Sequence, residues 1–269
     1  MAAVYEAKKV FYSYPGGVAA LAGTDMTVEK GSRAVILGAN GTGKSTLLQL
    51  FDGLIFPDSG ELRVFGEPLT EKSFEDAVFS RQFRKRVGFV FQNPDVQLFC
   101  PTVREDILFG PLQLGMSEPE TQARLDVIAR FLGIEKLLDR SCHQLSIGEK
   151  RKVAIATTLI IEPEVLLLDE PTAGLDPATT AHIIEMIQDA SASGKTVITA
   201  THDLHLVEEI ADTIFVFGAD KRIVRSGPAH EVLHDADFLQ KHNLTHAHRH
   251  HHDGTVHTHP HDHFEHHHP

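Results

Sequence analysis

The sequence contains no tryptophan, only two cysteines, and no long apolar run among its 269 residues. Because a transmembrane helix needs about 20 consecutive apolar residues, we expect that the chain does not itself span a bilayer. The two cysteines, Cys100 and Cys142, lack a CxxC spacing and offer no disulfide framework. This usage suits a reducing cytosol, and we expect both cysteines to be small buried residues.

Positive charge is scarce as well. The chain has 25 Lys and Arg residues against 37 Asp and Glu residues, a formal net charge of -12. Nucleic-acid backbones require a basic surface, so this balance argues against a nucleic-acid partner. It also opposes attraction to anionic lipid, so any membrane association should come from docking onto a protein.

What the sequence does contain is an alternation of strand and helix patterns. These patterns run over about residues 1–92 and 163–235, with a mainly helical segment, about residues 93–162, between them. Val165–Leu168 and Thr196–Thr201 are apolar runs typical of strands buried on both faces. We therefore expect an α/β fold with a mostly parallel sheet covered by helices.

Two helices are predicted within the helical segment. One spans Glu118–Leu132, and its predicted apolar face carries Ala123, Val127, Ile128 and Phe131. The other is predicted from Lys150 to Ile161.

A glycine-rich segment follows the predicted strand Arg33–Leu37 and opens the predicted helix Ser45–Phe51. It matches the pattern GxxxxGK[ST] with Gly38, Ala39, Asn40, Gly41, Thr42, Gly43, Lys44 and Ser45. Its glycines let the backbone approach phosphate oxygens, and its N–H groups present partial positive charge to an anion. We predict an ATP site in which Lys44 reaches the β- and γ-phosphates, Ser45 binds magnesium, and Thr46 extends the loop. A chance match is the alternative, and the strand-to-helix context argues against it.

Two carboxylates follow the apolar run Val165–Leu168. Asp169 and Glu170 should stand at the C-terminal end of a buried strand, where ligands bind in open α/β sheets. Asp169 is the predicted partner of magnesium, and Glu170 the predicted base or orienter of an attacking water. A surface acidic pair is the alternative, which the phosphate loop disfavours.

The segment Leu145–Glu149 resembles the LSGGQ signature of ATP-binding-cassette (ABC) ATPases. The resemblance implies that Ser146, Gly148 and Glu149 lie at a helix start and contact the γ-phosphate of ATP bound by another subunit. The segment departs from the signature at Ile147 and Glu149, whereas Ser146 and Gly148, which carry the phosphate contact, are kept.

Other segments resemble motifs of the same family in the family's order. This resemblance implies that Gln92 touches magnesium and that His202 contacts the γ-phosphate; a satisfied core histidine is the alternative for His202. Asp176 ends a segment, Ala173–Asp176, that resembles the loop passing between subunits. Tyr14 resembles the aromatic residue that stacks on adenine, and Tyr12 is the alternative candidate for this role.

The matches cover roughly residues 3–230 and imply a P-loop NTPase (RecA-like) core. In this fold a mostly parallel sheet is joined by an antiparallel β edge subdomain and an inserted α-helical subdomain. Residues 1–241 would form the ABC nucleotide-binding domain. The resemblance also implies a homodimer in the ATP state, in which each nucleotide lies between the phosphate loop of one subunit and Ser146 of the other. Lys44, Glu170 and His202 would then be catalytic.

The segment Gln92–Phe99 resembles the extended glutamine loop of energy-coupling-factor transporter ATPases, with a generic glutamine loop as the alternative. In that family the loop lines a groove for a helix of a transmembrane coupling subunit. The resemblance implies a second partner, a membrane-embedded substrate-binding subunit, and a peripheral location on the cytoplasmic face of the cell (inner) membrane.

Residues 242–269 should form a flexible tail, because 13 of these 28 residues are histidine and almost none is apolar. Neutral imidazole suits cobalt and nickel. The candidate ligands are His250, His251, His252, His257, His259, His261 and His263. An engineered tag is the alternative, although a tag is normally one uninterrupted run. An energy-coupling-factor ATPase with such a His-rich tail resembles the ATPase subunit of a cobalt or nickel importer.

Several alternatives stay open. A vitamin importer of the same type, or an exporter, would use the same ATPase chemistry. A nickel-delivery GTPase would need an NKxD motif, and the nearest segment, Gly218–Lys221, lacks the Asn. A soluble cassette ATPase of DNA repair or translation would usually carry two cassettes and a basic surface.

Overall fold

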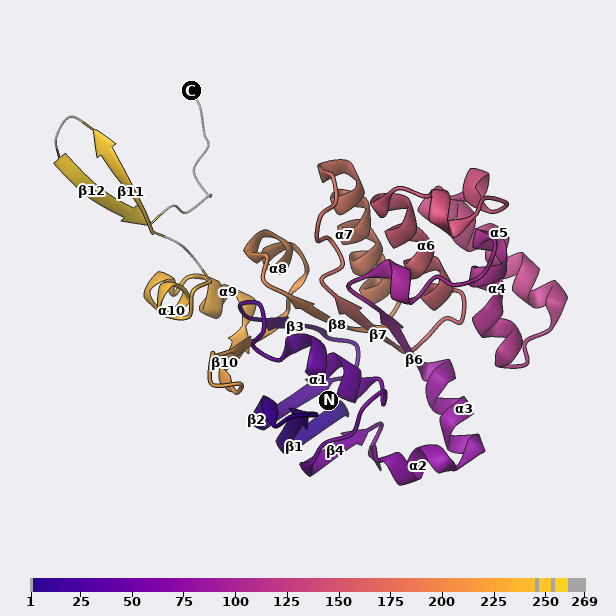
Figure 1. Cartoon of the computed structure of the whole chain (residues 1–269), viewed down its shortest axis with the longest axis horizontal. Coiled ribbons are helices and arrows are strands. Elements are labelled where there is room, and N and C mark those ends of the chain that lie inside the picture. Colours follow the sequence, from indigo (N-terminus) through magenta and orange to yellow (C-terminus); the bar gives the residue numbers. More distant parts are fainter. Residues whose placement is uncertain (1, 245–246, 253–254, 261–269) are drawn as a thin grey trace.

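The computed structural model describes residues 2–244 and the backbone of residues 247–252 and 255–260. Its central element is a six-stranded sheet in the order β10-β9-β3-β8-β7-β6 (Figure 1). The strands are β3 (Arg33–Leu37), β6 (Val87–Val90), β7 (Val165–Asp169), β8 (Thr196–Thr201), β9 (Thr213–Phe217) and β10 (Ile223–Pro228). Neighbouring strands run parallel except β9 and β10, which are antiparallel.

A second sheet is antiparallel and has the order β2-β1-β4-β5. Its strands are β1 (Ala3–Tyr14), β2 (Val18–Glu29), β4 (Ser59–Val64) and β5 (Glu67–Pro68). Helix α1 (Lys44–Phe51) lies between this sheet and the central sheet in Figure 1. The helix is therefore covered on both sides, and most of its side chains are buried.

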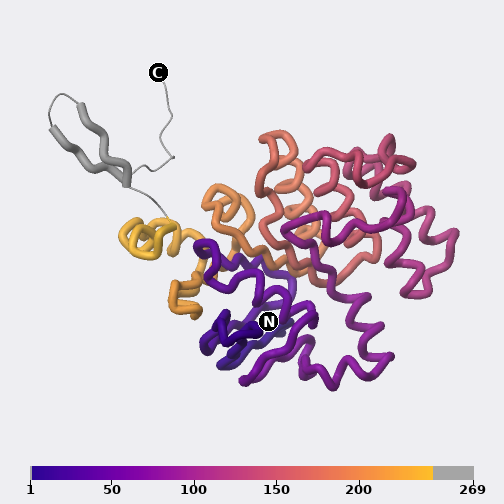
Figure 2. Tube along the Cα trace, viewed as in Figure 1, coloured from indigo at the N-terminus to yellow at the C-terminus, as the bar shows by residue number. Residues whose placement is uncertain are grey.

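The other helices flank the sheets or follow them. They are α2 (Glu71–Glu75), α3 (Ala77–Arg86), α4 (Val103–Gln113), α5 (Glu118–Leu132), α6 (Ile147–Leu159), α7 (Pro177–Ala192), α8 (Leu204–Ile210), α9 (Ala229–Leu233) and α10 (Ala236–Lys241). Three 3₁₀ turns complete them: η1 (Pro94–Val96), η2 (Glu135–Leu137) and η3 (Cys142–Gln144). Figure 2 shows the chain leaving the sheet after β6, forming α4, α5 and α6 on the right, and returning to β7. In the part of the chain that is described, no helix combines the length and apolar character needed to span a membrane.

The central strands bury both of their faces. Because successive side chains of a strand point to opposite faces, Val35 and Leu37 of β3 pack in the core that contains α4 to α8. Ala34 and Ile36 pack in the other core, with α1 and the antiparallel sheet. Two cores thus hold the sheet from both sides and fix the positions of the loops at its edge.

The structure confirms the predicted fold class: a mostly parallel sheet, an antiparallel edge sheet and an inserted helical segment. The predicted buried face of α5 is wrong. Its buried residues are Thr121, Leu125, Ala129 and Leu132, whereas Val127 and Phe131 are 64% and 39% exposed. Ala123 is also exposed, and only Ile128 of the predicted set packs against the core. Both stripes are apolar at helical spacing, so the packing against α4 and α6 decides between them.

The start of α6 was also predicted wrongly. The helix begins at Ile147, not Lys150, because Ser146 and Glu149 form a capping box. Ser146 Oγ accepts from Glu149 N at 3.3 Å, and a Glu149 carboxylate oxygen accepts from Ser146 N at 2.8 Å. This reciprocal pair starts the helix three residues earlier than its apolar pattern indicates.

In the predicted tail, the backbone of β11 (Ala247–His252) pairs antiparallel with that of β12 (Thr255–Pro260). The alternating and partly β-branched sequence of β12 suits a strand, whereas the composition predicted a flexible tail. The side chains of residues 245–269 lie outside the described residues. The metal-binding histidines predicted there therefore stay a prediction.

Candidate nucleotide-binding and catalytic site

The candidate residues meet at one edge of the central sheet. The neighbouring strands β3, β8, β7 and β6 are parallel, so their carboxyl ends lie at the same edge. Residues 38–43 follow β3, His202 follows β8, Glu170 follows β7, and Gln92 stands two residues beyond the end of β6. Residues separated by up to 164 positions in the sequence (202 − 38) are thereby brought together.

The glycine-rich loop is shaped by close approaches that exclude side chains. Gly43, the N-cap of α1, has a φ of 115°, and a Cβ there would lie 2.4 Å from the carbonyl oxygen of Ala20. No side chain caps α1, and its first turn contains no acidic residue. A helix N-terminus without a cap or an anion of its own can accept a phosphate.

Lys44 is almost fully buried beneath this loop. Its Nζ donates to Gly38 O at 2.7 Å and to Ala39 O at 3.3 Å, and it lies 3.4 Å from Glu170 Oε1. Burial lowers the pKa of Lys44, and the carboxylates of Glu170 and Asp169 oppose this shift. The ammonium group is therefore held at the base of the loop, within reach of an anion in the pocket.

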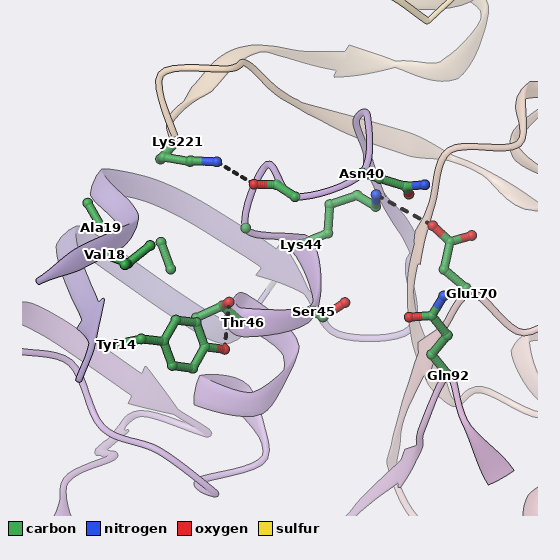
Figure 3. A pocket seen from close by; sticks show the side chains of 13 residues that line it. Tyr14, Val18, Ala19, Asn40, Lys44, Ser45, Thr46, Gln92, Glu170 and Lys221 are labelled. Atoms are coloured by element: carbon green, nitrogen blue, oxygen red, sulfur yellow. Dashed lines mark hydrogen bonds and ion pairs between the residues drawn. The ribbon is translucent and has the colours of Figure 1, made fainter. Parts of the chain in front are cut away.

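A pocket of about 360 Å³ lies in front of the loop (Figure 3). Its volume is in the range of small-molecule sites. It is lined by Tyr14, Val18, Ala19, Ala20, Asn40, Gly41, Gly43, Lys44, Ser45, Thr46, Gln92, Glu170 and Lys221. Of the predicted loop residues, Gly38, Ala39 and Thr42 are not in this lining: the carbonyls of Gly38 and Ala39 hold Lys44, and Thr42 Oγ1 donates to Ala39 O.

Glu170 is the most constrained acidic residue of the site. It has a left-handed φ of 45° and is only 4% exposed. Its Oε2 accepts from Thr201 Oγ1 at 3.0 Å, and its Oε1 lies 2.9 Å from His202 Nδ1. Left-handed backbone at a residue other than glycine costs about 1–3 kcal/mol and is concentrated at functional sites. Together with Lys44, these contacts fix the direction of the carboxylate.

Asp169 and Ser45 form the part of the site that fits magnesium. Ser45 Oγ donates to Asp169 Oδ1 at 3.0 Å. Burial raises the pKa of Asp169 to about 6, and the Ser45 hydrogen bond opposes this shift. A hydroxyl, a carboxylate and the nearby Gln92 amide supply the oxygen ligands that magnesium prefers. The residues present therefore fit a magnesium ion bound with a nucleotide phosphate.

Tyr14 stands at the other end of the pocket in Figure 3. Its hydroxyl lies 3.1 Å from Thr46 Oγ1, and the residue is 38% exposed. The ring of Tyr12 packs edge-on against it, with centroids 5.2 Å apart. Tyr14 lines the pocket and Tyr12 does not, so geometry favours Tyr14 as the residue that could stack on a base.

The structure does not bring every candidate to this pocket. Ser146, Gly148 and Glu149 are absent from its lining. The start of α6 lies instead beside the start of α7: a Cβ on Gly148 would be 3.6 Å from Thr179 Oγ1 and 4.0 Å from Asp176 Oδ2. Asp176 caps α7 by accepting from Thr179 N at 3.0 Å. Ser146 and Asp176 are both exposed.

Sequence reasoning missed several residues of the site. Thr201, which holds Glu170, could have been found from its position at the end of a predicted strand. Lys221 gave no such signal, because it lies 180 residues from the loop that it contacts. It follows β9, and its Nζ donates to Gly41 O. Val18, Ala19 and Ala20 complete one wall of the pocket.

The two cysteines lie away from the nucleotide pocket and are not part of its lining. Cys142 is buried and Cys100 is partly buried. Cys142 Sγ donates to Asp106 Oδ2 at 3.0 Å, and burial raises the pKa of this thiol to about 12. In the described part of the chain, no group of three or more His, Cys, Asp or Glu side chains could hold a metal ion.

The chain is similar to known transporter ATPases. Residues 21–173 match the family model described as ABC transporter. The nickel import ATP-binding protein NikO of Rhodobacter capsulatus is 49% identical over 248 residues, covering 91% of this chain and 96% of that protein. The energy-coupling factor transporter ATP-binding protein EcfA of Methanocaldococcus jannaschii is 42% identical over 243 residues, covering 90% of this chain and 85% of that protein.

The fold of this chain is also similar to that of a solved transporter ATPase structure. The structure of cbiO1 from Clostridium perfringens, described as part of the ABC transporter complex cbiONQ, superimposes with a TM-score of 0.76. The two chains are 37% identical, and the match covers 91% of this chain and 96% of that one.

Proposed function

This chain belongs to the ABC transporter ATPases, and we propose that it energises the import of a divalent transition-metal ion, nickel or cobalt, through a transporter of the energy-coupling-factor type. Members of this family bind ATP with magnesium and hydrolyse it. The observation that carries the catalytic part of the proposal is the buried Glu170 carboxylate, which lines the pocket and is held by Lys44, Thr201 and His202.

The proposed chemistry gives each of these groups a role. The N–H groups of the loop and Lys44 hold the phosphates. Glu170 accepts the proton of the water that attacks the γ-phosphate, and His202 holds Glu170 and reaches toward the same phosphate. Bound magnesium, held by Ser45, Asp169 and Gln92, would supply charge for the leaving phosphate oxygens. Lys44 and His202 keep the Glu170 carboxylate in a fixed orientation while it accepts the proton from water.

The position of Ser146 supports a dimer. Its hydroxyl stands at an exposed helix start outside the pocket of its own chain. Two copies related by a two-fold axis would place Ser146 of each chain against the nucleotide of the other. ATP would then join the two chains, and loss of the γ-phosphate would let them separate. Asp176, beside Gly148, would lie in the same interface.

An exposed aromatic pair supports docking to a transmembrane coupling subunit. Phe99 and Phe109 are 66% and 43% exposed, and their rings pack edge-on with centroids 5.0 Å apart. Val96, in the turn that follows Gln92, is 64% exposed. Apolar side chains exposed together favour a protein contact, and a helix laid on them would bear on the loop that carries Gln92. The chain would then lie on the cytoplasmic face of the cell membrane, beside the coupling subunit and a membrane-embedded substrate-binding subunit.

Two observations support a metal substrate over a vitamin. The nickel import protein NikO is 49% identical to this chain over nearly its whole length, and the tail of this chain is rich in histidine. Imidazole binds nickel and cobalt alike, so the tail does not separate the two ions. A vitamin importer is the second candidate, because the name of the EcfA relative specifies an energy-coupling-factor transporter and no metal.

The test is uptake by the reconstituted transporter. We expect ATP-dependent accumulation of labelled nickel or cobalt in vesicles that carry the complete complex, and none with Glu170→Gln. Uptake of a vitamin, with neither metal taken up, would overturn the substrate assignment. Removal of residues 242–269 then tests the tail: unchanged metal accumulation would rule out a necessary role for its histidines.

A further inference from the structure

Arg151 is a buried cation that the mechanism above does not use. It lies in the second turn of α6, and only 2% of the residue is exposed. Its Nη1 donates to Phe91 O at 2.7 Å, and its Nη2 donates to Gln92 O at 2.6 Å. A planar guanidinium can hold two acceptors at a fixed spacing, which the ammonium group of lysine cannot do. Arg151 therefore fixes the backbone at the beginning of the glutamine loop.

Other polar side chains join the same two elements. Lys150 Nζ lies 2.7 Å from Asp95 Oδ1. Gln97 Nε2 donates to Ala154 O at 2.8 Å. These bonds hold the middle of the loop against α6, while the guanidinium holds the part that carries Gln92.

The surroundings of Arg151 are those of a functional residue. Burial lowers the pKa of Arg151, and the carboxylates of Asp169 and Glu170 oppose this shift. Its Nε is buried and has no hydrogen-bond partner among the residues described. A buried charge costs free energy that an apolar side chain of similar size would not, which indicates a role beyond packing.

We infer that Arg151 is a positioning residue that makes the glutamine loop and the start of α6 move as one body, so that the hold of Ser146 on one nucleotide and the contact of Gln92 with magnesium at the other are set together. This inference rests on the proposed ATP-dependent dimer. Ser146 caps the helix that carries Arg151 five residues later. A shift of α6 toward the partner's nucleotide would therefore shift the Gln92 backbone of the same chain. The two sites of the dimer would be coupled through this bond.

The first experiment compares Arg151→Gln with Lys152→Gln, a substitution at the next residue of α6. We expect ATP affinity of the monomer, titrated with a fluorescent ATP analogue, to change by less than about threefold, because the phosphate loop is untouched. We expect the Hill coefficient of ATP hydrolysis to fall to 1 and kcat to fall about tenfold. In a Glu170→Gln background, dimer assembly should need more ATP. Lys152→Gln should keep the Hill coefficient and the kcat of the unaltered protein, because it leaves the bonds of Arg151 to Phe91 and Gln92 in place.

A double-mutant cycle separates positioning from general damage. If Arg151 acts through Gln92, then Arg151→Gln combined with Gln92→Ala should hydrolyse ATP within about twofold of Gln92→Ala alone. Multiplied effects would overturn the inference. So would a Hill coefficient that Arg151→Gln leaves unchanged.

Arg151→Lys provides a second variant should the glutamine variant fail to fold. It keeps the charge but can serve only one carbonyl well, so cooperativity should be intermediate; full cooperativity would contradict the inference. The unaltered protein distinguishes the two proposals. If it neither dimerises with ATP nor hydrolyses it, the proposed function fails and this inference falls with it. If it does both while Arg151 variants stay cooperative, only the inference fails.

Discussion

Two helix starts in this chain, both of which we propose to contact the nucleotide, differ in how they are capped. Helix α1 begins at Gly43, has no side-chain cap and has no acidic residue in its first turn. Helix α6 begins at Ser146 and is closed by a capping box, with the Glu149 carboxylate on the Ser146 N–H. The first lies in a pocket beneath the glycine-rich loop. The second lies on an exposed surface.

Because of this difference, we expect the two helix starts to bind the same nucleotide with different affinities. A helix N-terminus attracts anions through its free N–H groups and its dipole. At α1 nothing in the chain competes for these groups. At α6 a carboxylate already occupies the position, and hydrogen bonds from Ser146 lower the pKa of Glu149. A γ-phosphate arriving there must meet a like charge, so we expect tight binding at α1 and weaker, reversible closure at α6.

The largest effect is expected from Glu170→Gln. This substitution keeps the proposed nucleotide contacts at the starts of α1 and α6 but removes the catalytic base. ATP hydrolysis should fall by about 10²–10⁴-fold. Size-exclusion chromatography with ATP should then show a stable dimer, because the γ-phosphate is no longer removed. A variant that turns over ATP at the normal rate would contradict the role of Glu170.

Lys44→Ala removes the proposed contact between the Lys44 ammonium group and the phosphates at the start of α1. The ammonium group lies beneath the loop, and its loss leaves the phosphates without their buried cation. We expect ATP affinity, measured by equilibrium titration, to fall by about 100-fold or more. Lys152→Gln, which also removes one lysine charge, is the control. Retained affinity in Lys44→Ala would refute the placement of the phosphates.

Ser146→Ala removes the proposed hydrogen bond to the γ-phosphate of the nucleotide in the partner chain. ATP affinity of the monomer should stay unchanged, because Ser146 is outside the pocket. ATP-dependent dimerisation of the Glu170→Gln protein should weaken by roughly tenfold, since a hydrogen bond to a charged group contributes about 1.5–3 kcal/mol. Loss of the cap also destabilises α6 by about 1 kcal/mol, so Thr70→Ala, which removes the cap of α2, serves as a stability control. Equal loss of dimerisation in both variants would remove the case for a contact between subunits.

Glu149→Gln removes the acidic residue from the first turn of α6, so that this turn lacks a negative charge as the first turn of α1 does. Glutamine can keep the hydrogen bond to Ser146 N while removing the negative charge. We expect ATP-dependent dimerisation to tighten by roughly threefold at low salt and the gain to shrink at high salt, because charges at helix ends contribute about 0.3–1 kcal/mol. Analytical ultracentrifugation across a salt series measures this. Weaker dimerisation would show that the carboxylate helps the closure.

The smallest effect concerns the other end of α1, where Asp52 caps the helix. Burial raises the pKa of Asp52 from 3.8 to about 7, and Arg84, 3.0 Å away, opposes this shift. The folded protein thus holds this proton more tightly than the unfolded chain. The resulting stability is complete below about pH 4 and is lost as the pH rises to about 7.

Asp52→Asn keeps the group neutral at every pH. We expect its Tm to exceed that of the unaltered protein by a few degrees (roughly 2–4 °C per kcal/mol) at pH 8 and to match it near pH 4. Thermal unfolding at both pH values provides the measurement. A variant that is less stable at pH 8 would show that the ion pair with Arg84 outweighs the cost of burial.

The strand-end positions of the site could be predicted from the sequence, whereas its side-chain contacts could not. Apolar runs before Gly38, Asp169 and His202 placed these residues at the ends of buried strands, because a short apolar run that ends at a glycine or a polar residue is a local signal. The bond from Thr201 to Glu170 and the bond from Lys221 to Gly41 depend on strand order, which no local pattern contains.

The helical segment was harder to predict for a related reason. On α5, Leu125 and Val127 lie in two stripes that both carry apolar residues at helical spacing, and packing selects the buried one. At α6, Glu149 was interpreted as a departure from the signature rather than as half of a capping box. Arg151 stands between Lys150 and Lys152 in the sequence, and nothing in that basic run indicates that it is buried.

The central claim is that one ATP is held by Lys44 of one chain and Ser146 of another. A crystal structure of the Glu170→Gln protein with ATP and magnesium tests it most directly. The account predicts a two-fold dimer in which Ser146 Oγ lies within hydrogen-bond distance of a γ-phosphate oxygen whose nucleotide sits in the partner's phosphate loop. A nucleotide-filled structure with Ser146 far from every γ-phosphate would contradict it.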